Sequence, residues 1–300
     1  MTRTATGIHP RYPLALDHLV LPARSLDVAR DRFASLGFVV APTGIHPFGT
    51  ENCCVFLADG TYLEPLAICD AQRAARAVAE GNVFVARDRL YRDSRGEDGF
   101  SAVVLATGNA DQDHGRYVAA GLSAGDMLSF SRAFSDATGK SDVASFKLAF
   151  ASADKAGGAF LFACQRINAP DVDRSALQDH PNGVTGILEV VALSNAPAEQ
   201  HRLISVAVGD PAAAPTSGVF DLPNARLSVV DPALFAARFG LAAGAPTDLR
   251  FAAVVFSVRN ADAASRLLAA ASVEYDIAGN DIVVPPASGQ GAAFIFRETP

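Results

Sequence analysis

The chain has 300 residues, half of them apolar, and a formal net charge of −7 from 25 Lys and Arg against 32 Asp and Glu. An acidic balance gives no electrostatic footprint for nucleic acid. No apolar run approaches the roughly 20 residues that a membrane span needs. A chain of this length commonly divides into two domains. We therefore expect a small-molecule ligand and neither a nucleic-acid nor a membrane partner.

The four cysteines form no disulfide framework. Cys53 and Cys54 are adjacent, whereas Cys69 and Cys164 stand alone. Neighbouring strand residues face opposite ways, so the adjacent pair is not expected to act together. The N-terminus is interrupted by Pro and charged residues before an apolar segment forms, which argues against a signal peptide. These features predict a reducing, cytoplasmic location. The sequence leaves monomer and homodimer open.

The predicted elements begin with residues 16–21 (LDHLVL), an alternating run that indicates a strand. Residues 23–38 then have helical spacing with Gly37 near their end. Three strand-like pieces follow at residues 39–50, 52–60 and 61–68, separated by Gly, Pro and Asp turns. The order is therefore strand, helix and three strands.

His18 lies in the first of these strands and Glu64 in the last. Each is a titratable residue inside an apolar run, where burial is costly unless the group has a partner. A His and a carboxylate on two strands of one curved sheet are plausible metal ligands. The alternatives are that His18 is satisfied by backbone groups or by Glu64 itself, and that Glu64 is a surface carboxylate at a strand end.

This opening resembles the first module of the vicinal oxygen chelate superfamily and, more narrowly, its glyoxalase-like domain branch. The resemblance is carried by LDHLVL, by a helix ending in LGF, by a Gly-Thr-x-Asn turn and by YLE. It covers about the first quarter of the chain. The superfamily includes glyoxalase I, extradiol dioxygenases, fosfomycin-resistance transferases and bleomycin-sequestering proteins. The resemblance implies paired βαβββ modules whose sheets curl into a cup, with ligands on the first and fourth strands, here His18 and Glu64.

Internal repeats support this architecture independently. Residues 100–111 (FSAVVLATGNAD) match residues 251–262 (FAAVVFSVRNAD) without a gap, and both indicate a strand followed by a helix start. Residues 157–163 (GGAFLFA) likewise match residues 291–297 (GAAFIFR). A further module fits residues 187–231. Chance similarity of Ala- and Val-rich strands is the alternative, and two matches in the same order argue against it.

We therefore predict an α+β protein with four βαβββ modules paired into two vicinal-oxygen-chelate-like domains with curved mixed sheets. The first domain is expected over residues 1–166, with a helical segment at 70–97 joining its two modules. Residues 167–182, which are polar and contain Pro170 and Pro181, are expected to form the connection. Residues 183–300 are expected to form a second, degenerate domain.

The repeats also predict which half carries the site. Aligning the first strands places His18 opposite Ala102, Glu189 and Ala253, and aligning the last strands places Glu64 opposite Phe162, Ser228 and Phe296. Ala and Phe cannot bind a metal. We expect the polar site in the first domain only, with Glu189 structural and Phe296 filling part of the second cup.

A divalent metal (Zn, Ni, Mn or Fe) is a candidate cofactor, with His18 and Glu64 as ligands and His46 or His180 as a loop residue that completes the site. For both loop histidines the alternative is a ring that caps backbone groups. The predicted substrate-binding residues are Arg132, Asn52, Tyr62 and Phe162. Arg132 would bind a carboxylate or phosphate bidentately, Asn52 would hydrogen-bond a ligand or hold its turn, and the aromatic rings would supply apolar walls.

The expected function is a glyoxalase-like lyase or isomerase, metal-dependent or not, with His18 and Glu64 as its catalytic residues. One alternative is a protein that sequesters a small molecule without chemistry, of the bleomycin-resistance type. The other is an extradiol dioxygenase, which needs two His and one carboxylate on iron. No motif for nucleotide binding or serine hydrolysis is present. The sequence does not reveal the substrate.

Overall fold

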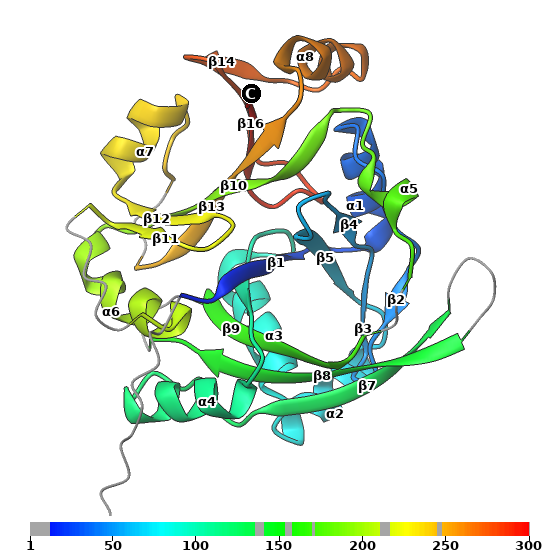
Figure 1. Cartoon of the computed structure of the whole chain (residues 1–300), viewed down its shortest axis with the longest axis vertical. Coiled ribbons are helices and arrows are strands. Elements are labelled where there is room, and N and C mark those ends of the chain that lie inside the picture. Colours follow the sequence, from blue (N-terminus) through cyan, green and yellow to red (C-terminus); the bar gives the residue numbers. More distant parts are fainter. Residues whose placement is uncertain are drawn as a thin grey trace, which may run out of the picture.

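The computed structural model describes residues 13–135, 141–153, 158–169, 172–210, 217–244 and 248–299. These residues form a mixed α+β protein with two curved, mixed sheets, which confirms the predicted fold class (Figure 1). Among the described helices, none combines the length and apolar character that crossing a membrane requires. The expectation about a signal peptide rests largely on residues 1–12, which lie outside the described residues.

The first sheet has the strand order β2-β3-β5-β1-β6-β9-β8-β7, and β4 also pairs with β5. Parallel pairing joins β1 to β5 and β6 to β9, while β1 and β6 are antiparallel. The strands are β1 Ala15–Pro22, β2 Gly44–Ile45, β3 Thr50–Asn52, β4 Val55–Phe56, β5 Tyr62–Ile68, β6 Ala102–Ala106, β7 Leu128–Ser135, β8 Ser141–Ala151 and β9 Phe160–Asn168.

The second sheet has the order β11-β12-β10-β13-β16-β15-β14. It repeats the central pairings of the first, because β10 is parallel to β12, β13 is parallel to β16, and β10 and β13 are antiparallel. The strands are β10 Val184–Leu193, β11 Val219–Asp221, β12 Arg226–Val230, β13 Arg250–Val258, β14 Asp276–Ala278, β15 Asp281–Val284 and β16 Ala293–Glu298.

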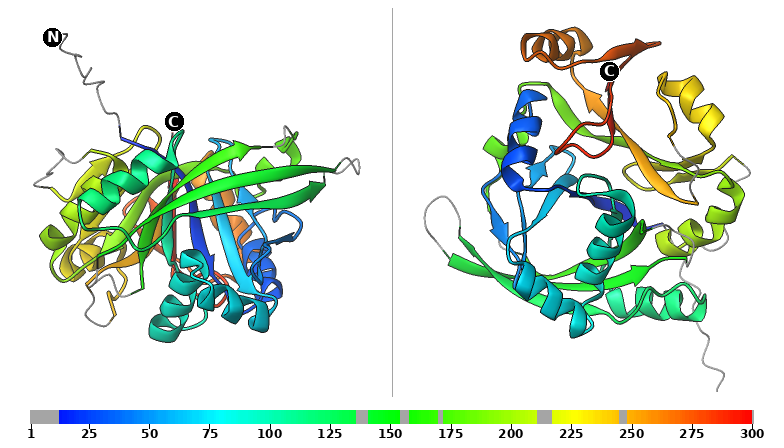
Figure 2. Two further views of the ribbon diagram at one scale, coloured as in Figure 1. Left: turned by 90° about the horizontal axis from the view of Figure 1, so that it is seen from below. Right: turned by 180° about the vertical axis from the view of Figure 1, so that it is seen from behind.

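The helices pack around the two sheets (Figure 1). Figures 1 and 2 show α2 and α3 together at one end of the first sheet, and α7 and α8 beside the second. The segment predicted to be helical at 70–97 is indeed helical, as two helices. The helices are α1 Leu26–Ser35, α2 Ala71–Ala79, α3 Val83–Arg95, α4 Ala110–Ala119, α5 Ser175–Gln178, α6 Pro197–Val208, α7 Pro232–Phe239 and α8 Ala261–Ala270.

The two segments of the longer repeat occupy equivalent places, as predicted. β6 and β13 are each central strands with one antiparallel and one parallel neighbour. Each leads to a helix whose N-cap is an Asn, Asn109 before α4 and Asn260 before α8, and each Asn side chain accepts a hydrogen bond from a first-turn backbone N–H. The arrangement of all four modules and the exact domain boundaries stay predictions.

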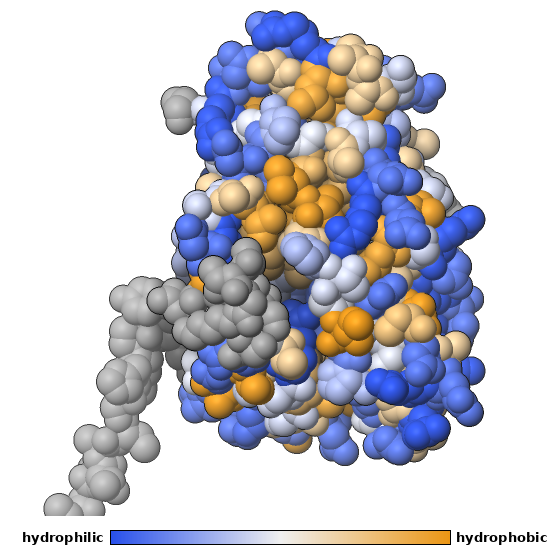
Figure 3. Space-filling model, turned by 90° about the vertical axis from the view of Figure 1, so that its right-hand side faces the viewer, coloured by the Kyte–Doolittle hydropathy of each residue, from blue (hydrophilic) through white to orange (hydrophobic). Residues whose placement is uncertain are grey.

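One large apolar core lies between the two sheets. It combines residues of β1, α1 and β6 with residues of β10, β13 and β16, among them Phe33, Phe100, Phe251 and Phe256. The outward surface is mixed, and apolar residues gather between hydrophilic ones on the face shown in Figure 3. Each sheet packs one face against this shared core. A separate cluster or a cavity can therefore form only on its opposite face.

The strand register corrects the alignment of the last repeat. Ala253 pairs with Ala293 and Val255 with Ile295 in the second sheet, where His18 pairs with Tyr62 and Val20 with Glu64 in the first. Ile295, and not Phe296, therefore corresponds to Glu64. Phe296 belongs to the core between the sheets. The prediction that Phe296 fills the second cup was wrong because a shift of one residue exchanges the faces of a strand.

The first sheet is nearly closed around its other face. Its two edge strands, β2 and β7, approach so closely that a side chain at Gly44 would collide with the guanidinium of Arg132. On this face α2 and α3 pack Ala77 and Phe84 into a cluster with Val104 and Phe162. What remains open is a cup bordered by β1, β5, β7, β8 and β9.

Candidate functional site

A bulge in β1 positions the first two polar residues of the cup. The pairing of β1 with β6 shifts between Leu16 and His18, so Asp17 is an extra residue in the ladder. Bulges re-aim side chains and are frequent beside active sites. Asp17 is buried, and its Oδ2 lies 3.5 Å from Nδ1 of His18. Arg166 on β9 donates a hydrogen bond to the other Asp17 oxygen.

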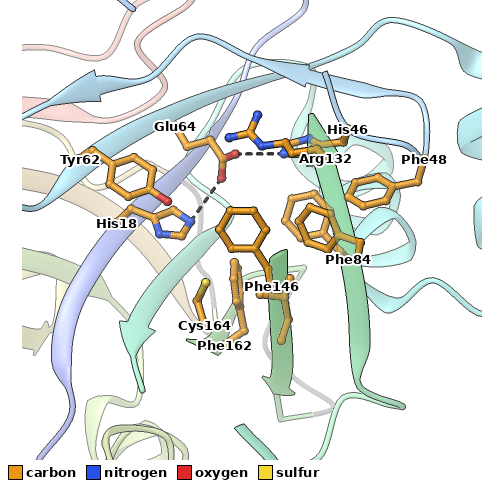
Figure 4. Close-up of a pocket in the computed structure, with 12 residues that line it drawn as sticks. His18, His46, Phe48, Tyr62, Glu64, Phe84, Arg132, Phe146, Phe162 and Cys164 are labelled. Atoms are coloured by element: carbon orange, nitrogen blue, oxygen red, sulfur yellow. Dashed lines mark ion pairs between the residues drawn. The ribbon is translucent and has the colours of Figure 1, made fainter. Parts of the chain in front are cut away.

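Glu64 on β5 lies between two imidazoles. Its Oε2 is 3.3 Å from Nε2 of His18, and its Oε1 is 3.7 Å from Nε2 of His46 (Figure 4). Asn52 on β3 donates a hydrogen bond of 2.6 Å to Oε1. The side chain of Glu64 is only 8% exposed. Nitrogen atoms of three side chains therefore surround this buried carboxylate, and that of Asn52 donates a hydrogen bond to it.

The turn that follows β2 brings His46 over the cup. Nδ1 of His46 is 2.8 Å from Oγ1 of Thr50, and its ring stacks on Phe48 with centroids 5.1 Å apart. Gly49 makes this turn possible, because it has a φ of 88° and its Cα lies so close to α2 that a Cβ would meet the backbone of Ala74. The Gly-Thr-x-Asn signal in the sequence thus corresponds to the turn that places His46.

The surroundings shift the pKa values of the two imidazoles in opposite directions. Burial opposes a charge on His18, but the contacts with Asp17 and Glu64 outweigh burial and raise the pKa of His18 above its usual value. Burial lowers the pKa of His46 to about 4. Burial would raise the pKa of Glu64, yet the hydrogen bond and charge of His18 together with Asn52 lower it to about 2. The site therefore favours the charged form of His18, the neutral form of His46 and the ionised form of Glu64.

Apolar groups form the rest of the cup. Tyr62 stacks on His18 with centroids 4.3 Å apart, and Phe162 meets the same ring edge-on at 5.8 Å. The cavity, including its open mouth, has a volume of about 420 Å³. Its lining residues are His18, His46, Phe48, Tyr62, Glu64, Phe84, Phe130, Arg132, Phe146, Leu148, Phe162 and Cys164. The polar cluster is thus one end of a mostly aromatic cavity.

The structure brings nearly all of the predicted site residues together. His18, Glu64, Tyr62, Arg132 and Phe162 line the cavity just described, as does His46. Asn52 reaches the cavity through its hydrogen bond to Glu64. Sequence reasoning missed Asp17 and Arg166, because it assumed strict alternation in β1 and had no signal for the partner on β9.

His180 lies elsewhere. Its Nδ1 accepts a hydrogen bond from the backbone N–H of Val39, and its Nε2 is 2.9 Å from the carbonyl oxygen of Phe56. Its ring packs edge-on against Phe38. Both ring nitrogens are used by the backbone, which removes His180 as a metal ligand and agrees with the structural alternative for this residue.

The donor set does not fit a complete metal centre. His18 and His46 approach different oxygens of Glu64 instead of converging with it on a common point. Across the part of the chain that the structure describes, no three His, Cys, Asp or Glu side chains are placed to hold one ion. The equivalent positions on β6 and β9 hold Ala102 and Phe162, which cannot bind a metal. The number of donors is that of a catalytic site, so it is the placement of the donors that does not fit.

The corresponding face of the second sheet is filled. Phe235 and Phe239 of α7 pack there with Val255 and Ile295. Glu189, which corresponds to His18, receives two hydrogen bonds from Arg238. A carboxylate engaged in this way is a structural ion pair. This geometry supports the prediction that the second half carries no polar cup.

Sequence comparison assigns the part of the chain that contains the cup to one family. A family model described as a glyoxalase-like domain matches residues 16–207. This range is more than half of the chain and includes the whole cup. No curated protein matches the chain in sequence.

Solved structures resemble the chain in fold. A hypothetical protein from Staphylococcus aureus has a TM-score of 0.63 at 13% identity, over 95% of this chain and 100% of that one. A mutant of 4-hydroxymandelate synthase from Streptomyces coelicolor has a TM-score of 0.59 at 12% identity, over 95% and 93%. A catechol 2,3-dioxygenase has a TM-score of 0.50 at 12% identity, over 96% and 93%. At such identities the likeness concerns the fold alone.

Proposed function

Because the chain belongs to the glyoxalase-like domain family of the vicinal oxygen chelate superfamily, we propose that it is a small-molecule isomerase or lyase that moves a proton on a ligand in the first cup. The observation that carries the proposal is the position of Glu64. Its carboxylate lies between His18 and His46 at the end of an aromatic cavity. Two bases with opposite protonation in one cavity are the usual sign of an acid–base pair.

His46 is the base in this proposal. When its Nδ1 donates to Thr50, its Nε2 carries the lone pair, which faces the amide nitrogen of Asn52 at 3.4 Å. A ligand in the cup takes the place of this long contact. Nε2 of His46 then removes a proton from a carbon next to a carbonyl group of the ligand. The imidazole stays neutral until then because burial disfavours its charged form.

His18 is the acid. Its Nε2–H faces Glu64. It gives its proton to the carbonyl oxygen of the bound ligand as His46 removes the carbon-bound proton, and the ligand becomes an enol. When the deprotonated carbon carries a hydroxyl group, the enol is an enediol: His46 returns its proton to the former carbonyl carbon, the hydroxyl gives its proton to His18, and an isomerisation is complete. When the carbon beyond the deprotonated one carries a leaving group, the enol oxygen returns its proton to His18, the carbonyl re-forms and the group departs, which completes an elimination. Glu64 keeps its negative charge throughout and stabilises whichever imidazole is cationic. Asp17 orients His18 from the other side.

A divalent metal has no part in these steps, because the donor set does not fit one. A dioxygenase is disfavoured for the same reason, since two imidazoles and a carboxylate must face one iron ion. Sequestration without chemistry is the second candidate. Two observations favour it. The polar groups of the cup are hydrogen-bonded to one another, as Asn52 is to Glu64, and the walls of the cup are mostly aromatic. A cavity of that kind binds an apolar molecule without reacting with it.

Exchange of carbon-bound hydrogen with solvent deuterium tests the proposal. A panel of 2-oxo and 2-hydroxy acids and hemithioacetals is incubated in D₂O and followed by proton NMR. We expect exchange in at least one compound, reduced by about 100-fold or more in His46→Ala and His18→Ala. Glu189→Gln, at the corresponding position in the second sheet, is the control and should retain it. Tight binding with no exchange in any compound would favour sequestration.

A further inference from the structure

We propose that a second pocket beside the cup is an oxyanion subsite, which selects ligands that carry a carboxylate at one end of an apolar body. The inference deepens the proposed function and depends on it only in placing the apolar body in the cup. The subsite is defined here by Arg132 and Arg174.

The second pocket opens directly from the cup. Both cavities are bordered by Tyr62, Glu64, Arg132 and Phe146. The second has a volume of about 890 Å³ including its mouth, and its lining combines polar side chains with apolar ones. A ligand can therefore place one end among the aromatic rings and the other end in the second pocket. Figure 4 shows the guanidinium of Arg132 beside Glu64 at the border between them.

Three guanidinium groups line the second pocket, from Arg132, Arg166 and Arg174. Asp17 compensates the charge of Arg166, and His18 compensates that of Glu64. Within the described ranges, Arg132 and Arg174 have no carboxylate partner. The lining therefore carries three guanidinium groups against one carboxylate, Glu64, and neither Arg132 nor Arg174 forms an ion pair with it.

Aromatic rings hold these two cations in place. The guanidinium carbon of Arg174 lies 4.6 Å from the ring centroid of Phe56, and that of Arg132 lies 6.0 Å from the centroid of Phe146. Stacking on a ring leaves the N–H groups along the edge of the guanidinium plane free to donate. Both side chains are half-buried, where an unbalanced charge is costly. A bound oxyanion removes that cost.

Two donors with planar, forked geometry match an oxyanion better than a neutral polar group. Arg174 lies just before α5, in the segment that connects the two sheets. The connection thus contributes to ligand selection as well as joining the halves. Gln178 at the end of α5 borders the same pocket, so one short segment supplies two of its polar residues.

Naphthyl probes of one shape and different charge test the subsite. The chain contains no Trp, so naphthyl emission is not masked by indole, and fluorescence anisotropy reports binding. The probes are 1-naphthylacetate, 1-naphthylacetamide and 1-naphthyl phosphate. We expect the wild type to bind the acetate about tenfold more tightly than the amide, which corresponds to about 1.4 kcal/mol. A phosphate that binds more tightly than the acetate identifies a phosphate subsite and overturns the choice of carboxylate.

Arg174→Ala and Arg132→Ala should each reduce the preference for the acetate to about twofold or less, with little change for the amide. Arg226→Ala is the control, because it removes one positive charge from an exposed ion pair on the second sheet. Equal affinity of the wild type for acetate and amide would overturn the proposal, as would a preference that survives in Arg174→Ala or the failure of all three probes to bind. The binding assay involves no chemistry, so a lack of deuterium exchange refutes the isomerase or lyase and leaves the subsite standing.

Discussion

Replacing Glu64 by Gln removes the carboxylate between the two imidazoles while keeping its shape. The folded protein holds the pKa of Glu64 at about 2, against an ordinary value of 4.5. A carboxyl group with a lowered pKa stabilises the fold above its unfolded pKa, and this contribution is lost as the pH falls through the folded value. At 1.36 kcal/mol per unit, the contribution at pH 6 is about 3 kcal/mol.

The same linkage gives the shape of the pH dependence. At pH 3 only about 1.4 kcal/mol of the contribution remains, so the difference between wild type and Glu64→Gln should shrink by about 2 kcal/mol between pH 6 and pH 3. At high pH the difference should shrink again once His18 loses its proton above its raised pKa. Stability should therefore differ most on the weakly acidic side of neutrality.

Urea unfolding followed by circular dichroism at several pH values measures this difference. Glu80→Gln, which removes an exposed carboxylate at the end of α2, is the control for a change of one surface charge. A difference between wild type and Glu64→Gln that is constant from pH 6 to pH 3 would refute the reasoning, because it would mean that Glu64 is not an ionised partner of His18.

Three further outcomes follow from the geometry. Phe162→Ala removes a buried ring from the wall of the cup and should lower the free energy of unfolding by about 3–5 kcal/mol, measured by urea titration; a loss under about 1 kcal/mol contradicts the packing. Glu189→Gln should leave naphthylacetate binding unchanged, whereas His18→Ala should weaken it. The reverse result would show that the site lies in the second half of the chain. Added Zn²⁺, Ni²⁺, Mn²⁺ or Fe²⁺ should change the melting temperature equally in wild type and His18→Ala, and a rise in the wild type alone would show that the cup binds metal after all.

The pairing of His18 with Glu64 could be predicted because both lie on strands of one repeating unit. Polar residues in apolar strand runs are rare enough to be noticed, and parallel neighbours place such residues side by side. Tyr62 lies on the same strand as Glu64, and Phe162 lies on β9, the last strand of the next repeating unit. The ungapped repeat likewise identified β6 and β13 as equivalent strands, since central strands that are buried on both faces have near-continuous apolar sequences.

The remaining features depend on details that no periodic pattern reports. The bulge that directs Asp17 toward His18 is one extra residue in a ladder. The same one-residue ambiguity exchanged Phe296 for Ile295 in the last strand. Arg174 reaches the second pocket because the connecting segment folds back beside β4, and such a long-range approach leaves no local signal in the sequence.

The central claim is that two imidazoles in one cup differ in protonation, with Glu64 between them. Nitrogen NMR of the imidazole rings tests it most directly, and six histidines are few enough to assign by substitution. At pH 6 we predict a doubly protonated ring for His18 and a neutral ring with a single tautomer for His46, the latter persisting down to about pH 5 because burial lowers its pKa to about 4. Titration of both rings together near their ordinary pKa of 6.5 would contradict the acid–base pair.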